Sequence, residues 1–119
     1  MAITHTTDPQ RGQTYDVLTV ATTCAASGNN TIIAAPGAGY RLKLHNIQMQ
    51  LEAATTTTAL VKSGSTTIGR FYMKNEGDGR IKEWPVGRER RLGENEALIL
   101  NLSGANQIGY EVEYEIERV

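Results

Sequence analysis

The chain has 119 residues, of which 39% are hydrophobic and 21% charged, a composition typical of one folded domain rather than of a disordered chain. Twelve Lys and Arg residues against 13 Asp and Glu give a net charge of −1, so the overall charge favours neither nucleic acid nor an anionic membrane. The single cysteine, Cys24, excludes an intramolecular disulfide, and no apolar run approaches the length of a membrane-spanning helix. The N-terminus shows no apolar stretch of the kind found in signal peptides, so we expect one small soluble domain.

The N-terminal stretch MAITHTTDPQRGQT is polar, contains a proline and shows no apolar periodicity. These properties predict a flexible arm over residues 1–14 that becomes ordered on contact with a partner, followed by a single domain over residues 15–119. The side chains of the arm that are candidates for this contact are Thr4, His5, Asp8 and Arg11.

Downstream of the arm, apolar residues alternate with polar ones, as expected of half-buried strands. Glycine, asparagine and aspartate separate these segments in SGNN, APGAGY, SGSTT, NEGDGR, LGENE and LSGANQ, which are typical of turns. The expected strands lie near residues 15–23, 30–35, 40–51, 56–62, 66–73, 80–84, 97–102 and 108–118. About eight short strands with turns at this spacing predict an all-β fold, a single sandwich of antiparallel strands.

The segment YRLKLHNIQMQLE changes its alternation half-way along. Leu42 and Leu44 share one parity, whereas Ile47 has the other. A strand of fixed register cannot keep one buried face through such a change. The sequence therefore predicts a β-bulge at His45–Asn46, or a strand that bends from one sheet to the other.

The polar face of the last expected strand consists of glutamates, namely Glu111, Glu113, Glu115 and Glu117. Side chains two residues apart on such a face lie about 7 Å from each other and repel modestly. A neighbouring strand that presents Arg41 and Lys43 would replace this repulsion with cross-strand ion pairs. The alternatives are that the acidic face meets another subunit or remains in water.

Few residues could carry catalysis or hold a metal. His45 has no obvious acid or base partner, and Cys24 is interpreted as a small buried apolar side chain. The segment NEGDGR lacks the spacing of a calcium loop, and APGAGY lacks the Lys and the Ser or Thr of a phosphate-binding loop. We therefore expect no enzyme activity, no cofactor and no metal site.

The segment GRERRLG contains the one local cluster of charge, formed by Arg88, Arg90 and Arg91. Arginine side chains suit carboxylates and phosphates, so this segment is interpreted as a solvated loop, with a contact to an acidic protein surface as the first alternative and a contact to nucleic acid or a glycan as the second. Trp84, the only tryptophan, is either a core residue or the anchor of the same contact. These four residues complete the set of candidate interface residues begun by the arm.

Two stretches resemble small β-sandwich proteins encoded in the structural modules of tailed bacteriophages and prophages. RLGENEALILNLSGANQIGYEVEYEIERV is similar to their closing hairpin, of the type L-x-x-G-E-x-L-x-L-x-L-S-x-A-x-x-V-x-G-x-V-x-Y. SGNNTIIAAPGAGYRLKLHNIQMQL is similar to their opening, with N-T-x-I-x-A, a glycine-containing loop and a long strand that begins Y-R-L-x-L. The match covers roughly residues 27–118 and consists of strand and turn residues.

The resemblance implies a jelly-roll-like sandwich in a virion protein, most often a capsid decoration (cement) protein that binds and stabilises the shell. It also implies the major capsid protein as partner, a homo-oligomer with the trimer favoured, and a place on the capsid surface after synthesis in the bacterial host cytoplasm. The alternative is a head or tail accessory, or a fibre-associated protein with a carbohydrate- or receptor-binding role. Carbohydrate sites typically show exposed aromatic platforms, whereas only 6% of this chain is aromatic.

Overall fold

The computed structural model describes the backbone of residues 2–8 and 13–119 and the side chains from residue 17 onward. The described chain is all-β and contains no helix that could cross a membrane. Its ten strands are β1 (Ala2–Asp8), β2 (Gln13–Cys24), β3 (Gly28–Ile33), β4 (Tyr40–Leu51), β5 (Thr57–Ser63), β6 (Thr66–Met73), β7 (Gly79–Glu83), β8 (Arg90–Arg91), β9 (Leu98–Leu102) and β10 (Ile108–Arg118). The eight expected strands are all present, each within two residues of the expected ends, and β1 and β8 are additional.

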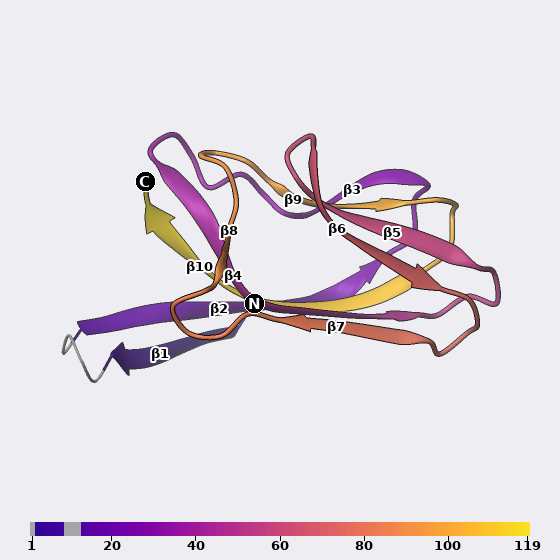
Figure 1. The fold of residues 1–119 in the computed structure, drawn as a ribbon, viewed down its shortest axis with the longest axis horizontal. Helices are drawn as coiled ribbons and strands as arrows, with labels where there is room; N and C mark the ends of the chain where they lie inside the picture. The colour runs from indigo at the N-terminus through magenta and orange to yellow at the C-terminus, as the bar shows by residue number, and fades with distance from the viewer. Residues whose placement is uncertain (1, 9–12) are drawn as a thin grey trace.

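The strands form two antiparallel sheets that pack face to face (Figure 1). The first sheet has the order β1-β2-β10-β4-β7, with β8 also paired to β4, and the second has the order β3-β9-β5-β6. β2 pairs with β10 in the first sheet, and the next strand, β3, pairs with β9 in the second. In the same way, β4 pairs with β7 in the first sheet and β5 pairs with β6 in the second. Each of these two double-stranded ribbons therefore passes from one sheet into the other, and the pairings β10–β4 and β5–β9 join the ribbons side by side. This is the strand order of a jelly roll, as the sequence resemblance implies.

The core fills the space between the sheets and consists of the apolar side chains at alternate positions of each strand. Its largest fully buried apolar side chains are Leu42, Leu44, Ile47, Leu51, Met73, Leu98, Leu100, Leu102, Ile108 and Val112. Burial of one such aliphatic side chain stabilises the fold by about 1.5–3 kcal/mol. The apolar residues at every second position of the strands therefore hold the two sheets together.

The predicted irregularity in β4 is a β-bulge. Asn46 pairs with Glu113 and Leu44 pairs with Tyr114, so His45 is an extra residue between them. Leu44 and the residue three positions further on are both buried as a result. The strand stays in the first sheet over its whole length, so the bulge is confirmed and the alternative bend between sheets is wrong.

The N-terminal residues add a strand that the sequence pattern does not predict. β1 pairs with the first half of β2, from Ala2 opposite Thr19 to Asp8 opposite Gln13. β10 pairs with β2 only as far as Leu18, so the β1–β2 hairpin continues past this pairing and diverges from the end of β10 (Figure 1). The flexibility expected of residues 1–14 stays a prediction.

Candidate interface surfaces

The glutamate face of β10 lies against a row of basic side chains on β4. The Arg41 Nε atom is 2.7 Å from Glu117 Oε1, and the Lys43 Nζ atom is 3.2 Å from Glu115 Oε2 and 3.8 Å from Glu117 Oε2. His45 Nε2 lies 2.6 Å from Glu115 Oε2, and Glu115 is only 7% exposed. The cross-strand pairing expected from the sequence is confirmed, and the bulge adds His45 to it.

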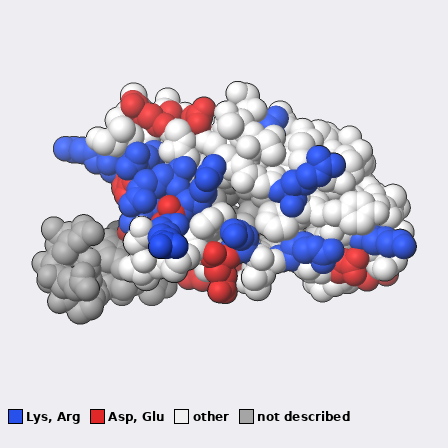
Figure 2. All heavy atoms as spheres, in the orientation of Figure 1, with Lys and Arg blue, Asp and Glu red and all other residues white. Residues whose placement is uncertain are grey.

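This ion-pair ladder reaches a third strand, because Arg91 of β8 also places its Nε 2.7 Å from Glu117 Oε1. At the other end, the Asn46 amide donates to Glu113 Oε1 over 2.8 Å. Partial burial alone would raise the pKa of Glu117, but the hydrogen bonds and charges of Arg41 and Arg91 outweigh it and hold that pKa below its ordinary value. Figure 2 shows basic and acidic atoms mixed over this end of the molecule. The ladder ties β4, β8 and β10 together.

The arginines of GRERRLG do not form one cluster. Arg90 and Arg91 are neighbours in β8 and therefore point to opposite faces, Arg91 toward the ladder and Arg90 toward the side that faces the second sheet. Arg88 is exposed in the preceding turn. Arg90 instead shares a pocket with Trp84, which is half-buried and packs against the core. Whether these four side chains contact a partner stays a prediction.

Of the candidates in the arm, Thr4, His5 and Asp8 lie in β1. Arg11 lies outside the described residues. Their role in a contact likewise stays a prediction.

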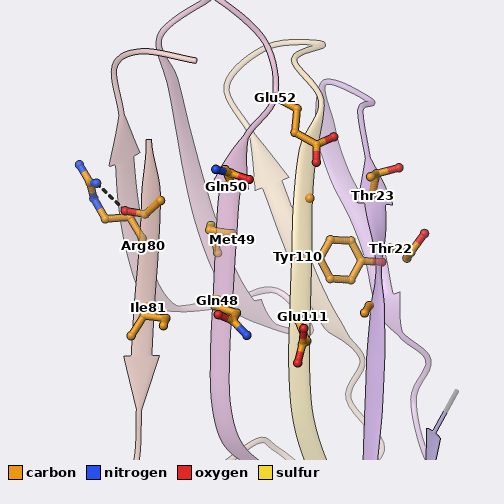
Figure 3. A pocket seen from close by; sticks show the side chains of 13 residues that line it. Thr22, Thr23, Gln48, Met49, Gln50, Glu52, Arg80, Ile81, Tyr110 and Glu111 are labelled. Carbon is orange, nitrogen blue, oxygen red and sulfur yellow. Dashed lines mark hydrogen bonds between the residues drawn. The ribbon is translucent and has the colours of Figure 1, made fainter. Parts of the chain in front are cut away.

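A shallow hollow of about 690 Å³ lies on the outer face of the first sheet, across β2, β10, β4 and β7 (Figure 3). Gln48 and Gln50 of β4 and Glu111 of β10 are among its lining side chains. Gln50 is flanked by Gly109 on β10 and Gly79 on β7, and the Glu52 side chain covers the place where a side chain at Gly109 would lie. The sequence pattern does not reveal this hollow, because it depends on which strands become neighbours.

The glycine-rich segments of the sequence are turns. Asp78 of NEGDGR accepts hydrogen bonds from the backbone N–H groups of Asn75 and Lys74, both over 2.8 Å, and these bonds hold its pKa below the ordinary value. In APGAGY, the N–H groups of Gly37 and Gly39 donate to side chains of the turn at residues 93–96.

The described part of the chain contains no group of three or more His, Cys, Asp and Glu side chains that could hold a metal ion. Burial raises the pKa of the Cys24 thiol, which favours its unreactive protonated form.

Comparison with known proteins yields no family. No protein-family model matches the chain, and no curated protein sequence does so either. Among solved structures, the chain is similar to the coat protein of Tobacco streak virus in a dimer structure, with 16% identity, a TM-score of 0.38, and coverage of 83% of this chain and 84% of that chain. A second structure of that coat protein gives 13% identity, a TM-score of 0.37 and coverage of 87% and 88%. At these values the likeness adds nothing to the strand order described above.

Proposed function

We propose that this chain is a virion structural protein, and that it decorates and stabilises the capsid shell of a tailed bacteriophage. The observation that carries the proposal is a pair of open strand edges at one end of the first sheet. Residues 13–17 of β2 pair with β1 but not with β10, and residues 115–118 of β10 pair with β4 but not with β2.

Open strand edges carry backbone N–H and C=O groups that can accept a further strand. The β1–β2 hairpin diverges from β10 and leaves the edge of β10 unpaired at residues 115–118. This arrangement suits a protein that binds a neighbour on each side: the hairpin of one copy extends to a neighbouring molecule, and the free edge of β10 pairs with a strand from another. In this proposal the neighbours are the major capsid protein and further copies of the chain, with a trimer as the favoured assembly.

The proposed mechanism is mechanical and needs no reactive group. Each copy bridges adjacent shell subunits and adds interface area that must separate before the shell ruptures. Each contact contributes modestly, and attachment through several contacts at once makes release slow. The ion-pair ladder contributes by holding β4, β8 and β10 in one rigid body beside the open edge.

The test is deletion of residues 1–14, followed by binding to purified shells that lack this protein. The deletion leaves the β2–β10 pairing from Leu18 to Cys24 intact, so the sandwich should still fold, as circular dichroism and thermal unfolding would verify. We expect binding to weaken at least about tenfold, because the hairpin and its edge are lost. The full-length Lys74→Gln variant removes an exposed cation that is not among the candidate interface residues; it is the matched control and should bind as the unmodified protein does. Unchanged binding by the truncated protein would refute the role of the arm.

The copy number in purified particles tests the proposal at a second level. Quantitative mass spectrometry should find the chain at an abundance close to that of the major capsid protein. Absence from particles would refute the virion role.

The hollow on the outer face favours a second candidate function, that of a fibre-associated or accessory protein with a carbohydrate or receptor ligand. Amide and carboxylate side chains such as Gln48, Gln50 and Glu111 suit sugar hydroxyl groups. A low copy number together with glycan binding that is lost in Gln50→Ala would favour this function over decoration.

A further inference from the structure

Trp84 and Arg90 line a pocket between the two sheets. It opens on the side where β7 is the edge strand of the first sheet and β6 is the edge strand of the second. It has a volume of about 390 Å³, within the range of small-molecule sites. Ile47 and Val61 form its floor and are 1% and 2% exposed, and Phe71 also lines it. The interior is therefore apolar and continuous with the core.

A β-bulge in β6 creates the space. Val61 pairs with Gly69 and Lys62 pairs with Thr67, which leaves Ile68 as an extra residue beside the pocket. Gly69 lies directly opposite Val61 and places no side chain over it. A methyl group at Gly69 would lie 3.5 Å from the Val61 Cβ atom, so a larger side chain there would project into the pocket region.

Basic side chains surround this apolar interior. Lys82 of β7 pairs with Ile47, and Arg90 of β8 pairs with Leu44. Directly opposite residues share a face of the sheet, so both cations lie on the side that faces the second sheet. Arg70 of β6 lines the pocket from the other sheet. Long basic side chains in such positions keep their stems on apolar surface and their charges at the mouth.

Every polar side chain that lines the pocket is a hydrogen-bond donor without an acceptor atom: Arg70, Lys82, Trp84 and Arg90. The ion pairs formed among the described side chains use Arg41, Lys43, His45 and Arg91 instead. The pocket therefore combines an apolar floor with an indole N–H and with three cations that form no ion pair within the described part of the chain.

We propose that this pocket binds a small amphiphilic anion, meaning an apolar group that carries one carboxylate or comparable negative headgroup. The apolar part lies on Ile47, Val61 and Phe71, and the headgroup meets the cations at the mouth. Inward-pointing charges on edge strands also discourage unwanted strand pairing. That role alone requires neither the bulge in β6 nor the vacancy at Gly69. The proposal stands independently of the virion function.

The only tryptophan of the chain lines this pocket, so its fluorescence reports on occupancy directly. The protein is titrated with octanoate, 1-octanol and octylamine, which share a chain and differ in the charge of the headgroup. We expect octanoate to shift the emission of Trp84 saturably, and to bind at least about tenfold more tightly than the neutral and the cationic compounds. Added salt should weaken octanoate more than octanol.

Two variants and a matched control assign the effect to the pocket. Arg90→Gln should weaken octanoate about three- to tenfold and leave octanol unchanged, because it removes charge and keeps the apolar floor. Gly69→Val should weaken both compounds, because it fills the space above Val61. Arg88→Gln removes a cation from the same loop, outside the pocket, and should change neither affinity.

Three results would overturn the proposal. One is the absence of any saturable change in the fluorescence. Another is equal affinity for octanoate and octanol, which would mean that the charges do not recognise an anion. The third is equal losses in Arg90→Gln and Arg88→Gln, which would mean that octanoate responds only to the general charge of the surface.

Discussion

Glu117 is the carboxylate at which the ion-pair ladder converges, and Glu117→Gln removes its charge while keeping its size. Two short ion pairs are lost, those with Arg41 and Arg91 at 2.7 Å each, together with the longer one with Lys43 at 3.8 Å. The Glu117 side chain is 23% exposed and that of Arg91 is 40% exposed, so solvent screens both pairs. At about 0.5–1 kcal/mol for each short pair and less for the long one, plus repulsion among the three cations left behind, we expect a loss of about 2 kcal/mol in the free energy of unfolding.

The pH dependence of this loss has a definite sign. The pKa of Glu117 in the folded protein lies below its ordinary value of 4.5. The contribution to stability is therefore fully present above the unfolded-state pKa and disappears as the pH falls through the folded-state pKa. The difference between the unmodified protein and Glu117→Gln should be constant around neutral pH and should shrink in acid.

Urea unfolding at neutral pH, and at the lowest pH at which both proteins still fold, measures this difference. Glu111→Gln is the matched control, because Glu111 lies on the same face of β10 but takes part in none of the ion pairs among the described residues. We expect this control to change the free energy by less than about 0.5 kcal/mol. A loss in Glu117→Gln no larger than in the control, or one that does not shrink in acid, would refute the reasoning.

Two further predictions concern the bulge and the core. Deletion of His45, the extra residue of the bulge, should leave a folded protein, because apolar and polar residues then alternate regularly along β4. Deletion of Gln48 should prevent folding, because the side chains on one side of the deletion would then point to the wrong face of the sheet. Circular dichroism and urea unfolding of both deletions test this, and failure of both to fold would contradict it. Leu100→Ala should lower the free energy of unfolding by about 2–5 kcal/mol, since Leu100 is 0% exposed; a loss below about 1 kcal/mol in urea unfolding would contradict its place in the core.

The sequence predicts those parts of the fold in which a short pattern of residues is compatible with few local structures. The alternation in β10 specifies a half-buried strand, and the change of parity around His45 predicts either a bulge or a bend between sheets, of which the structure shows the bulge. The basic residues Arg41 and Lys43 at matching spacing allow the ladder itself to be expected. In each case the pattern lies within one strand, or in two strands that both carry charged residues at every second position.

Other parts of the structure have no such local pattern. β1 has the sequence AITHTTD, without apolar alternation, and joins the sheet through backbone pairing with β2. β8 consists of Arg90 and Arg91 alone and has the composition of a charged loop. The inter-sheet pocket needs Trp84 and Gly69 to come together across two different sheets, and only the order of the strands determines that.

The position of β10 has a consequence for how the protein forms in the cell. β10 lies between β2 and β4 in the first sheet, yet it follows the nine other strands of the described chain in sequence. During synthesis, β2 and β4 therefore emerge from the ribosome long before the strand that joins them. Pairings over such long stretches of chain form slowly, and unpaired strands are prone to association with other chains. The first sheet can therefore be completed only after β10 has been translated, and until then the edges of β2 and β4 that β10 will cover are open to association with other chains.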